Sequence, residues 1–103
     1  MKKIFLDKSK LKSCLNAEKV IENDLGSCEL YVIKFQQDED YLVFVFQGRN
    51  TRYFKIMRPF IGKWNCYEAI YHAEGLFGFA DENLEFKIKE KLERLKESEP
   101  REI

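Results

Sequence analysis

The chain has 103 residues, 45% of them hydrophobic and 35% charged, and its 18 basic side chains balance 18 acidic ones. This length predicts one domain, at residues 1–97, followed by a frayed tail at residues 98–103. One Trp, five Tyr and nine Phe supply enough apolar surface to argue against a disordered chain. No apolar run approaches the roughly 20 residues of a membrane span, and no signal peptide is recognisable. Three widely spaced cysteines suit reduced thiols, so we expect a cytoplasmic protein.

The first predicted element after a short strand at Lys3–Leu6 is a helix that begins at the N-cap residue Asp7 and ends at Gly26. Its apolar residues share one face, but two glutamates interrupt that face. A break at Asn16 removes the conflict, because the residues after it then form a second apolar stripe. We therefore expect helix over this region, with a kink or break near Asn16.

Three segments rich in β-branched and aromatic residues predict strands at Cys28–Gln36, Tyr41–Gln47 and Thr51–Met57. The connections between them are polar and of hairpin length, which favours an antiparallel meander. The middle strand is apolar from Tyr41 to Phe46, so both of its faces should be covered. The third strand mixes charged and apolar residues on both faces and is expected at an edge of the sheet.

Two further helices are predicted after the strands. Asn65 and Glu68 have the spacing of a capping box, for a helix that Gly75 would end. The last helix spans Asp81–Glu97, where an apolar stripe is formed by Leu84, Ile88, Leu92 and Leu95. Phe86 lies outside this stripe, so either this turn contacts something else or the segment begins as a strand.

The predicted order is thus αβββαα, an α+β domain with a small three-stranded antiparallel meander packed with helices.

Residue types that carry out catalysis or bind metals are scarce. His72 is the single histidine, whereas most acid–base sites and many metal sites draw on more than one such group. Zinc commonly takes closely spaced cysteine pairs, and Cys14, Cys28 and Cys66 form none. The glycines form neither a phosphate-binding loop nor a dinucleotide fingerprint. We therefore expect no catalytic residues, no metal and no cofactor. An enzyme would need a cleft that the fold assembles from the cysteines, His72 and carboxylates.

The stretch from Tyr41 to Tyr67 contains no Asp or Glu and interleaves basic with aromatic residues. Such a surface suits an anionic ligand, either a nucleic-acid backbone or an acidic protein face. The alternative is structural, with the rings in the core or sealing the edge of the sheet. The candidate partner-binding residues are Arg49, Arg52, Lys55, Arg58, Phe60, Lys63 and Trp64.

The order of a helix, three antiparallel strands and a helix over residues 8–97 resembles the double-stranded-RNA-binding domain, which implies binding to RNA duplexes. That family begins its last helix with a Lys-Lys-x-Ala-Lys-like sequence, whereas this chain offers acidic starts at residues 65–69 and 81–84. The same order is similar to some small phage-encoded inhibitors of bacterial defence nucleases, anti-CRISPR proteins among them.

The favoured hypothesis is a small non-catalytic protein that binds and modulates a protein partner, for example a phage or mobile-element inhibitor of a nucleic-acid-handling defence enzyme. Neutral net charge, many aromatics and few catalytic groups support it. The alternative is a nucleic-acid-binding module that uses residues 49–64. Both a monomer and a homodimer fit the residues, because the edge strand and Phe86 offer two seams.

Overall fold

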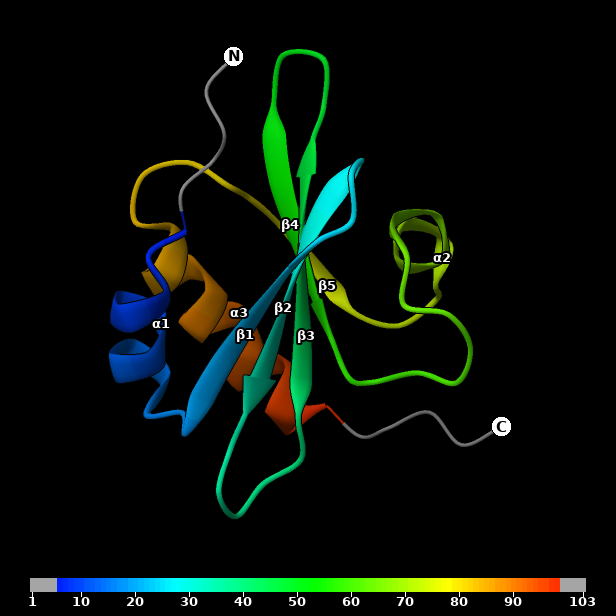
Figure 1. Ribbon diagram of the computed structural model, residues 1–103. Coiled ribbons are helices and arrows are strands. Elements are labelled where there is room, and N and C mark those ends of the chain that lie inside the picture. The colour runs from blue at the N-terminus through cyan, green and yellow to red at the C-terminus, as the bar shows by residue number, and fades with distance from the viewer. Residues whose placement is uncertain (1–5, 99–103) are drawn as a thin grey trace.

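The computed structural model describes residues 6–98, which form a five-stranded antiparallel sheet and three helices (Figure 1). The strands follow one another across the sheet in the order β1-β2-β3-β4-β5. The α+β class and the antiparallel sheet are therefore as expected, but the predicted three-stranded order αβββαα is wrong, since the observed order is αββββαβα. The elements are α1 (Lys8–Leu15), β1 (Lys19–Asp24), β2 (Cys28–Lys34), β3 (Tyr41–Gln47), β4 (Arg52–Met57), α2 (Cys66–Tyr71), β5 (Leu76–Phe79) and α3 (Leu84–Glu97).

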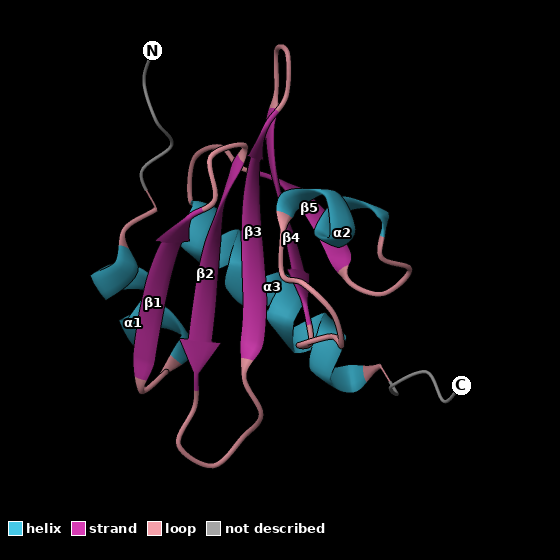
Figure 2. Cartoon of the chain, turned by 45° about the vertical axis from the view of Figure 1, so that its right-hand side comes forward, coloured by secondary structure: helices cyan, strands magenta, loops and turns pink. Residues whose placement is uncertain are grey.

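The sheet lies between helices, with α1 and α3 on one face and α2 on the other (Figure 2). Alternate residues of β3 enter two different hydrophobic clusters, because neighbouring side chains of a strand point to opposite faces. Val43 packs in the cluster with α1 and α3, whereas Leu42 and Phe44 pack in the cluster with α2. The prediction that β3 is covered on both faces is confirmed, and its bounds are the predicted ones.

The predicted helix from Asp7 to Gly26 is wrong beyond Leu15. Asn16 adopts a left-handed conformation, with φ 55° and ψ 42°, which ends α1 at the predicted break. The chain then forms strand β1 instead of a second helix, because Val20 and Ile21 contact the clusters on opposite faces of the sheet. Of the strand predicted at residues 3–6, only Leu6 is described, and it is buried outside any strand.

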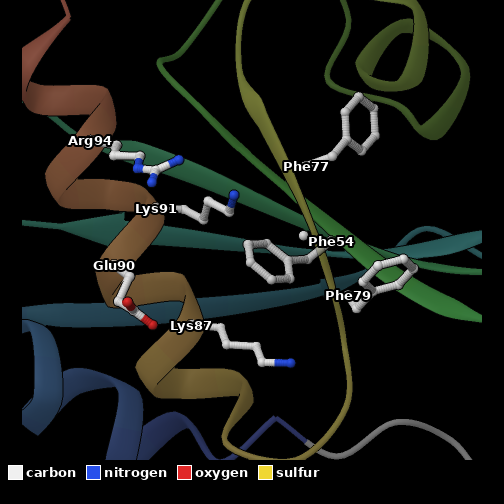
Figure 3. A pocket seen from close by; sticks show the side chains of 8 residues that line it. Phe54, Phe77, Phe79, Lys87, Glu90, Lys91 and Arg94 are labelled. Carbon is white, nitrogen blue, oxygen red and sulfur yellow. The ribbon is translucent and has the colours of Figure 1, made fainter.

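β4 is not an edge strand, because β5 pairs with it along Leu76–Phe79. β5 has four residues, too few to show a clear alternation in the sequence. Gly78 is required at its centre, since an added Cβ would lie 2.6 Å from the ring of Phe54. Figure 3 shows Phe54 on the α3 side of β5, with Phe77 and Phe79 on the other side.

The helices before and after β5 are shorter than predicted. α2 begins as expected, because the side chain of Asn65 accepts a hydrogen bond from the backbone N–H of Glu68 at 2.8 Å, but it ends at Tyr71 instead of Gly75. α3 begins at Leu84 instead of Asp81, and its predicted apolar stripe is buried. Phe86 is exposed on this helix, so the strand alternative for this segment is wrong.

Cys28 and Cys66 form a disulfide, which corrects the expectation of reduced thiols. The fold brings the start of β2 and the start of α2 together, although the two cysteines are 38 positions apart in the sequence. Disulfides are typical of oxidising compartments, so the cysteines no longer support a cytoplasmic location. Across the described part of the chain, no helix combines the length and the apolar character that crossing a membrane requires.

Candidate functional site

The predicted binding residues do not form one surface. Two of them lie at the β3–β4 hairpin, at one end of the sheet, and three lie in the β4–α2 loop near the other end (Figures 1 and 2). The remaining two, on β4 and directly after it, contact other parts of the protein. These three groups are Arg49 with Arg52, then Phe60, Lys63 and Trp64, and finally Lys55 and Arg58.

Lys55 is a core residue, with 1% of its surface exposed. Its Nζ donates hydrogen bonds to the carbonyl oxygens of Ala69, at 2.8 Å, and His72, at 2.6 Å. These oxygens lie at the C-terminal end of α2, where a cation is favourable. Burial lowers the pKa of Lys55. This lysine therefore holds α2 against the sheet and is inaccessible to an anionic partner.

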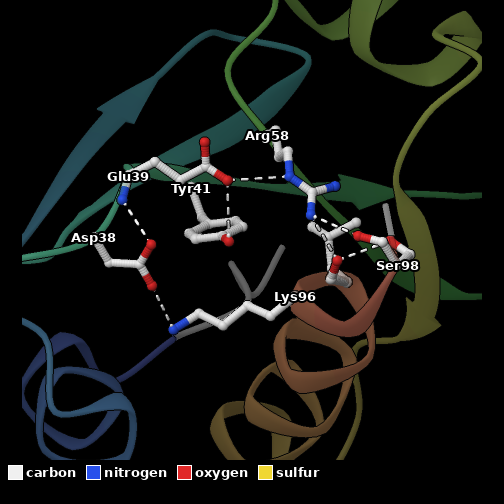
Figure 4. A network of polar contacts seen from close by, with 7 residues as sticks. Asp38, Glu39, Tyr41, Arg58, Lys96 and Ser98 are labelled. Atoms are coloured by element: carbon white, nitrogen blue, oxygen red, sulfur yellow. Dashed lines mark hydrogen bonds and ion pairs between the residues drawn. The ribbon is translucent and has the colours of Figure 1, made fainter. Parts of the chain in front are cut away.

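Arg58 joins two distant parts of the chain (Figure 4). Its Nε pairs with Glu39 at 3.1 Å, in the β2–β3 hairpin. Another guanidinium nitrogen donates to the carbonyl oxygens of Leu95, at 2.8 Å, and Ser98, at 3.1 Å, at the end of α3. Because its side chain is mostly buried by these contacts, Arg58 stabilises the fold by joining the β2–β3 hairpin to the end of α3.

The hairpin that contains Glu39 is held by further ion pairs. Asp38 lies 2.8 Å from Lys96 of α3, and Asp40 lies 3.1 Å from Lys34 of β2. The hydrogen bond from Lys96 lowers the pKa of Asp38. The three acidic residues directly before the basic stretch are therefore each paired with a cation in the folded protein.

Arg49 and Arg52 share a hollow with acidic residues. The hollow lies between the β3–β4 hairpin and the segment after β5, and Asp81 and Glu82 also line it. Arg52 donates from Nε to the side-chain oxygen of Gln47 at 3.1 Å. The excess of cations along the sequence therefore does not become a continuous basic surface, because residues from other segments offset it.

Large apolar side chains are exposed on the β4–α2 loop and on α2, within residues 61–71. We call this set the loop–α2 surface; it comprises Ile61 (103% exposed), Trp64 (37%), Tyr67 (71%) and Tyr71 (73%). Tyr67 and Tyr71 are one helical turn apart, and their ring centroids are separated by 4.8 Å. They lie on a short helix whose Ala69 is fully buried, so α2 presents one face to the core and its aromatic residues to solvent.

The loop–α2 surface has a well-defined support. Trp64 donates from its indole nitrogen to the carbonyl oxygen of Phe60 at 2.8 Å. The Phe60 ring in turn contacts the His72 ring, with centroids 4.7 Å apart, which connects the loop to the end of α2. The Cys28–Cys66 disulfide anchors the first turn of α2, and Lys55 binds its last turn. Phe60 therefore positions Trp64 and is itself half-buried.

The sequence-based candidates Phe60, Lys63 and Trp64 lie in the same loop as this surface, whereas the exposed residues Ile61, Tyr67 and Tyr71 were not among the candidates. The spacing of Tyr67 and Tyr71, four residues apart on a predicted helix, is a local signal that both rings share one face. The exposure of Ile61 had no such signal, since an isolated apolar residue in a loop is buried or exposed only as the fold dictates.

His72 lies beside this surface and is held by two contacts. His72 packs its ring on Phe60, and its Nδ1 accepts a hydrogen bond from the backbone N–H of Glu74 at 3.3 Å. Over residues 6–98, no three His, Cys, Asp or Glu side chains are placed to hold a metal ion. No family model matches the chain, and comparisons with curated proteins and with solved structures find no match.

Proposed function

We propose that the chain is a small non-catalytic module that binds a protein partner through the loop–α2 surface. The observation that carries this proposal is the exposure of four large apolar side chains within residues 61–71. Exposed apolar patches commonly mark interaction sites, and Trp and Tyr are enriched among the residues that dominate binding energy.

The support of this surface favours binding. A loop that is already ordered loses less conformational entropy when a partner docks, and more of the interaction energy then appears as affinity. The indole hydrogen bond of Trp64, the N-cap at Asn65 and the disulfide at Cys66 all fix the backbone under the exposed rings. A protein that acts in this way serves as an inhibitor or an adaptor, according to the partner it binds.

Nucleic-acid binding through residues 49–64 has weaker support. Of the five cations in that segment, Lys55 binds carbonyl oxygens inside the protein and Arg58 pairs with Glu39. The two arginines of the hairpin share their hollow with Asp81 and Glu82. A phosphate backbone is bound by several cations at once, and this arrangement supplies few that lie together.

The proposal is tested by capture from an extract of the source cell, with and without nuclease, on the immobilised full chain. The test variant is Ile61→Ser/Tyr71→Ser, and the matched control is Phe86→Ser, which removes an exposed aromatic residue from α3 on the opposite face of the sheet. We expect wild type and the control to retain the same protein, and the double variant to bind it at least about 30-fold more weakly, the effect of about 2 kcal/mol.

We expect the double variant to fold, because both substituted side chains are largely exposed, and thermal unfolding checks this. Equal capture by the double variant would contradict the proposal. Capture that disappears after nuclease treatment, or that weakens steeply with salt, would instead favour the nucleic-acid alternative.

A further inference from the structure

A groove of about 390 Å³ lies between β5 and α3, away from the loop–α2 surface. Figure 3 shows α3 beside β5, with Lys91 and Arg94 extending from the helix towards the strand. The ring of Phe54 and the backbone at Gly78 line the groove between the two elements. The groove therefore combines an edge strand, an apolar ring and basic side chains.

The backbone of β5 has an unpaired side. Ala80 donates its N–H to the carbonyl of Arg52 at 2.8 Å, and hydrogen-bonded pairs alternate with non-hydrogen-bonded pairs along an antiparallel ladder. Gly78, two residues before Ala80, therefore turns its backbone groups towards β4, whereas Phe77 and Phe79 turn theirs outward. β5 is the last strand of the sheet, so within residues 6–98 no strand pairs with these outward groups. Such an edge can accept another strand.

The groove is lined by more cations than anions. Lys87, Lys91 and Arg94 follow one face of α3 at helical spacing, and Glu90 is the acidic residue among them. Lys87 is paired with Asp81. The side chains of Lys91 and Arg94 form no ion pair or hydrogen bond with any other described residue. Two cations are thus available to carboxylates that enter the groove.

We infer that the β5–α3 groove binds an extended segment of a partner protein with acidic residues at alternate positions. The segment adds a strand to β5 through the backbone groups of Phe77 and Phe79. Because side chains alternate along a strand, one set faces α3, where carboxylates meet Lys91 and Arg94. The other set faces the exposed rings of Phe77 and Phe79, which favours apolar residues at those positions.

Charge decides between this occupant and a second copy of the chain. Two β5 edges that pair with each other would place the cationic faces of two α3 helices on the same side of the joined sheet, where like charges repel. An acidic segment instead supplies the charge that Lys91 and Arg94 lack. The β5–α3 groove is a different surface from the loop–α2 surface, so binding at one is independent of binding at the other.

The test uses the ¹⁵N-labelled full chain and a capped eight-residue peptide of alternating Glu and Val. We expect amide exchange at Phe77 and Phe79 to slow by about tenfold or more in the complex, while the Gly78 amide, already paired with β4, changes little. The variant Lys91→Gln/Arg94→Gln should bind the peptide at least about tenfold more weakly. The variant Lys89→Gln/Lys19→Gln loses the same charge outside the groove and should bind like wild type.

Two altered peptides and inorganic phosphate test separately whether charge, alternation of residues and an extended segment are required. A peptide with Lys in place of Glu, and one with four Glu followed by four Val, should each bind at least about tenfold more weakly than the alternating peptide. Equal binding of either peptide, unchanged Phe77 and Phe79 amides, or no binding at millimolar peptide would overturn the inference. Inorganic phosphate that displaces the peptide and affects the same residues equally would reduce the groove to a simple anion site, which also overturns it. Peptide-induced changes confined to residues 61–71 would overturn it while leaving the proposed function intact.

Discussion

At the scale of single residues, Lys55 shows how charge along a sequence differs from charge on a surface. It lies in the middle of an acid-free stretch and was expected to contact an anionic partner. In the folded protein it binds the carbonyl oxygens of Ala69 and His72 instead, at the base of α2. A buried ammonium is costly unless it is hydrogen-bonded, and these oxygens provide that compensation.

We expect Lys55→Met to reduce the free energy of unfolding by about 1 to 3 kcal/mol. The substitution keeps an unbranched side chain of similar length but leaves two carbonyl oxygens of α2 without their donor. Urea unfolding measures the loss. Hydrogen exchange should show that the substitution increases the opening of the amides of residues 66–71 more than that of the amides of β3.

Lys63→Met is the matched control, because Lys63 is exposed in the β4–α2 loop. Its free energy of unfolding should stay within about 0.5 kcal/mol of wild type. If the two variants are equally stable, the contacts of Lys55 with α2 contribute nothing to the fold.

At the scale of elements, α2 is too short to be stable alone. It has six residues, fewer than an isolated helix needs in water. Its position depends on the Asn65 cap, the Cys28–Cys66 disulfide and Lys55. The same three contacts support the loop–α2 surface, so the surface and the helix should weaken together.

Removal of the disulfide in Cys28→Ala/Cys66→Ala should lower the free energy of unfolding by about 2 to 4 kcal/mol, because the crosslink restricts the unfolded chain over 38 residues. Thermal unfolding with and without a thiol reductant checks this. Wild type should lose stability on reduction, and the variant should not respond.

Cys14→Ala serves as the control for this experiment, since Cys14 is the free cysteine of the chain. It should keep the response to reductant that wild type shows. A wild-type protein whose melting temperature is unchanged by complete reduction would indicate that α2 is held by its other contacts alone.

At the scale of the whole molecule, the sheet is the common support, because both hydrophobic clusters are built on it. Tyr41, at the start of β3, belongs to the cluster with α1 and α3, and its hydroxyl donates to Glu39 at 3.3 Å. Burial raises the pKa of Tyr41 to about 12, and burial also raises that of Tyr31 on the neighbouring strand. Titration of these two buried hydroxyls therefore makes the free energy of unfolding depend on pH in the alkaline range.

The free energy of unfolding should fall as the pH rises from about 10 to about 12. Over this range the unfolded chain releases the Tyr41 proton near its ordinary pKa of about 10, whereas the folded protein keeps it, so the unfolded state is favoured. Tyr41→Phe removes this contribution and should give a shallower decline, with Tyr31 responsible for part of the remainder. Urea unfolding at a series of alkaline pH values measures both slopes.

Tyr67→Phe provides the comparison at an exposed tyrosine of α2. Its decline with pH should match that of wild type. Identical slopes for wild type and Tyr41→Phe would show that the hydroxyl of Tyr41 does not control alkaline unfolding.

The sequence by itself determined the features that depend on local patterns. β2, β3 and β4, the buried stripe of α3, the Asn65 cap and the break at Asn16 were all recognisable from periodicity, composition or capping residues. Each depends on residues within a few positions of one another. The same patterns also marked the β4–α2 loop as a candidate site, through Phe60 and Trp64.

Only the tertiary structure decided the features that depend on distant residues. β5 has only four residues, and the apolar residues of β1 fit a helix equally well in isolation. Both segments become strands because β4 and β2 offer them partners. The Cys28–Cys66 disulfide and the contacts of Lys55 and Arg58 join segments that are 14 to 40 residues apart. Side-chain direction and long-range pairing are set by packing against the rest of the chain, and a linear pattern of residues does not contain them.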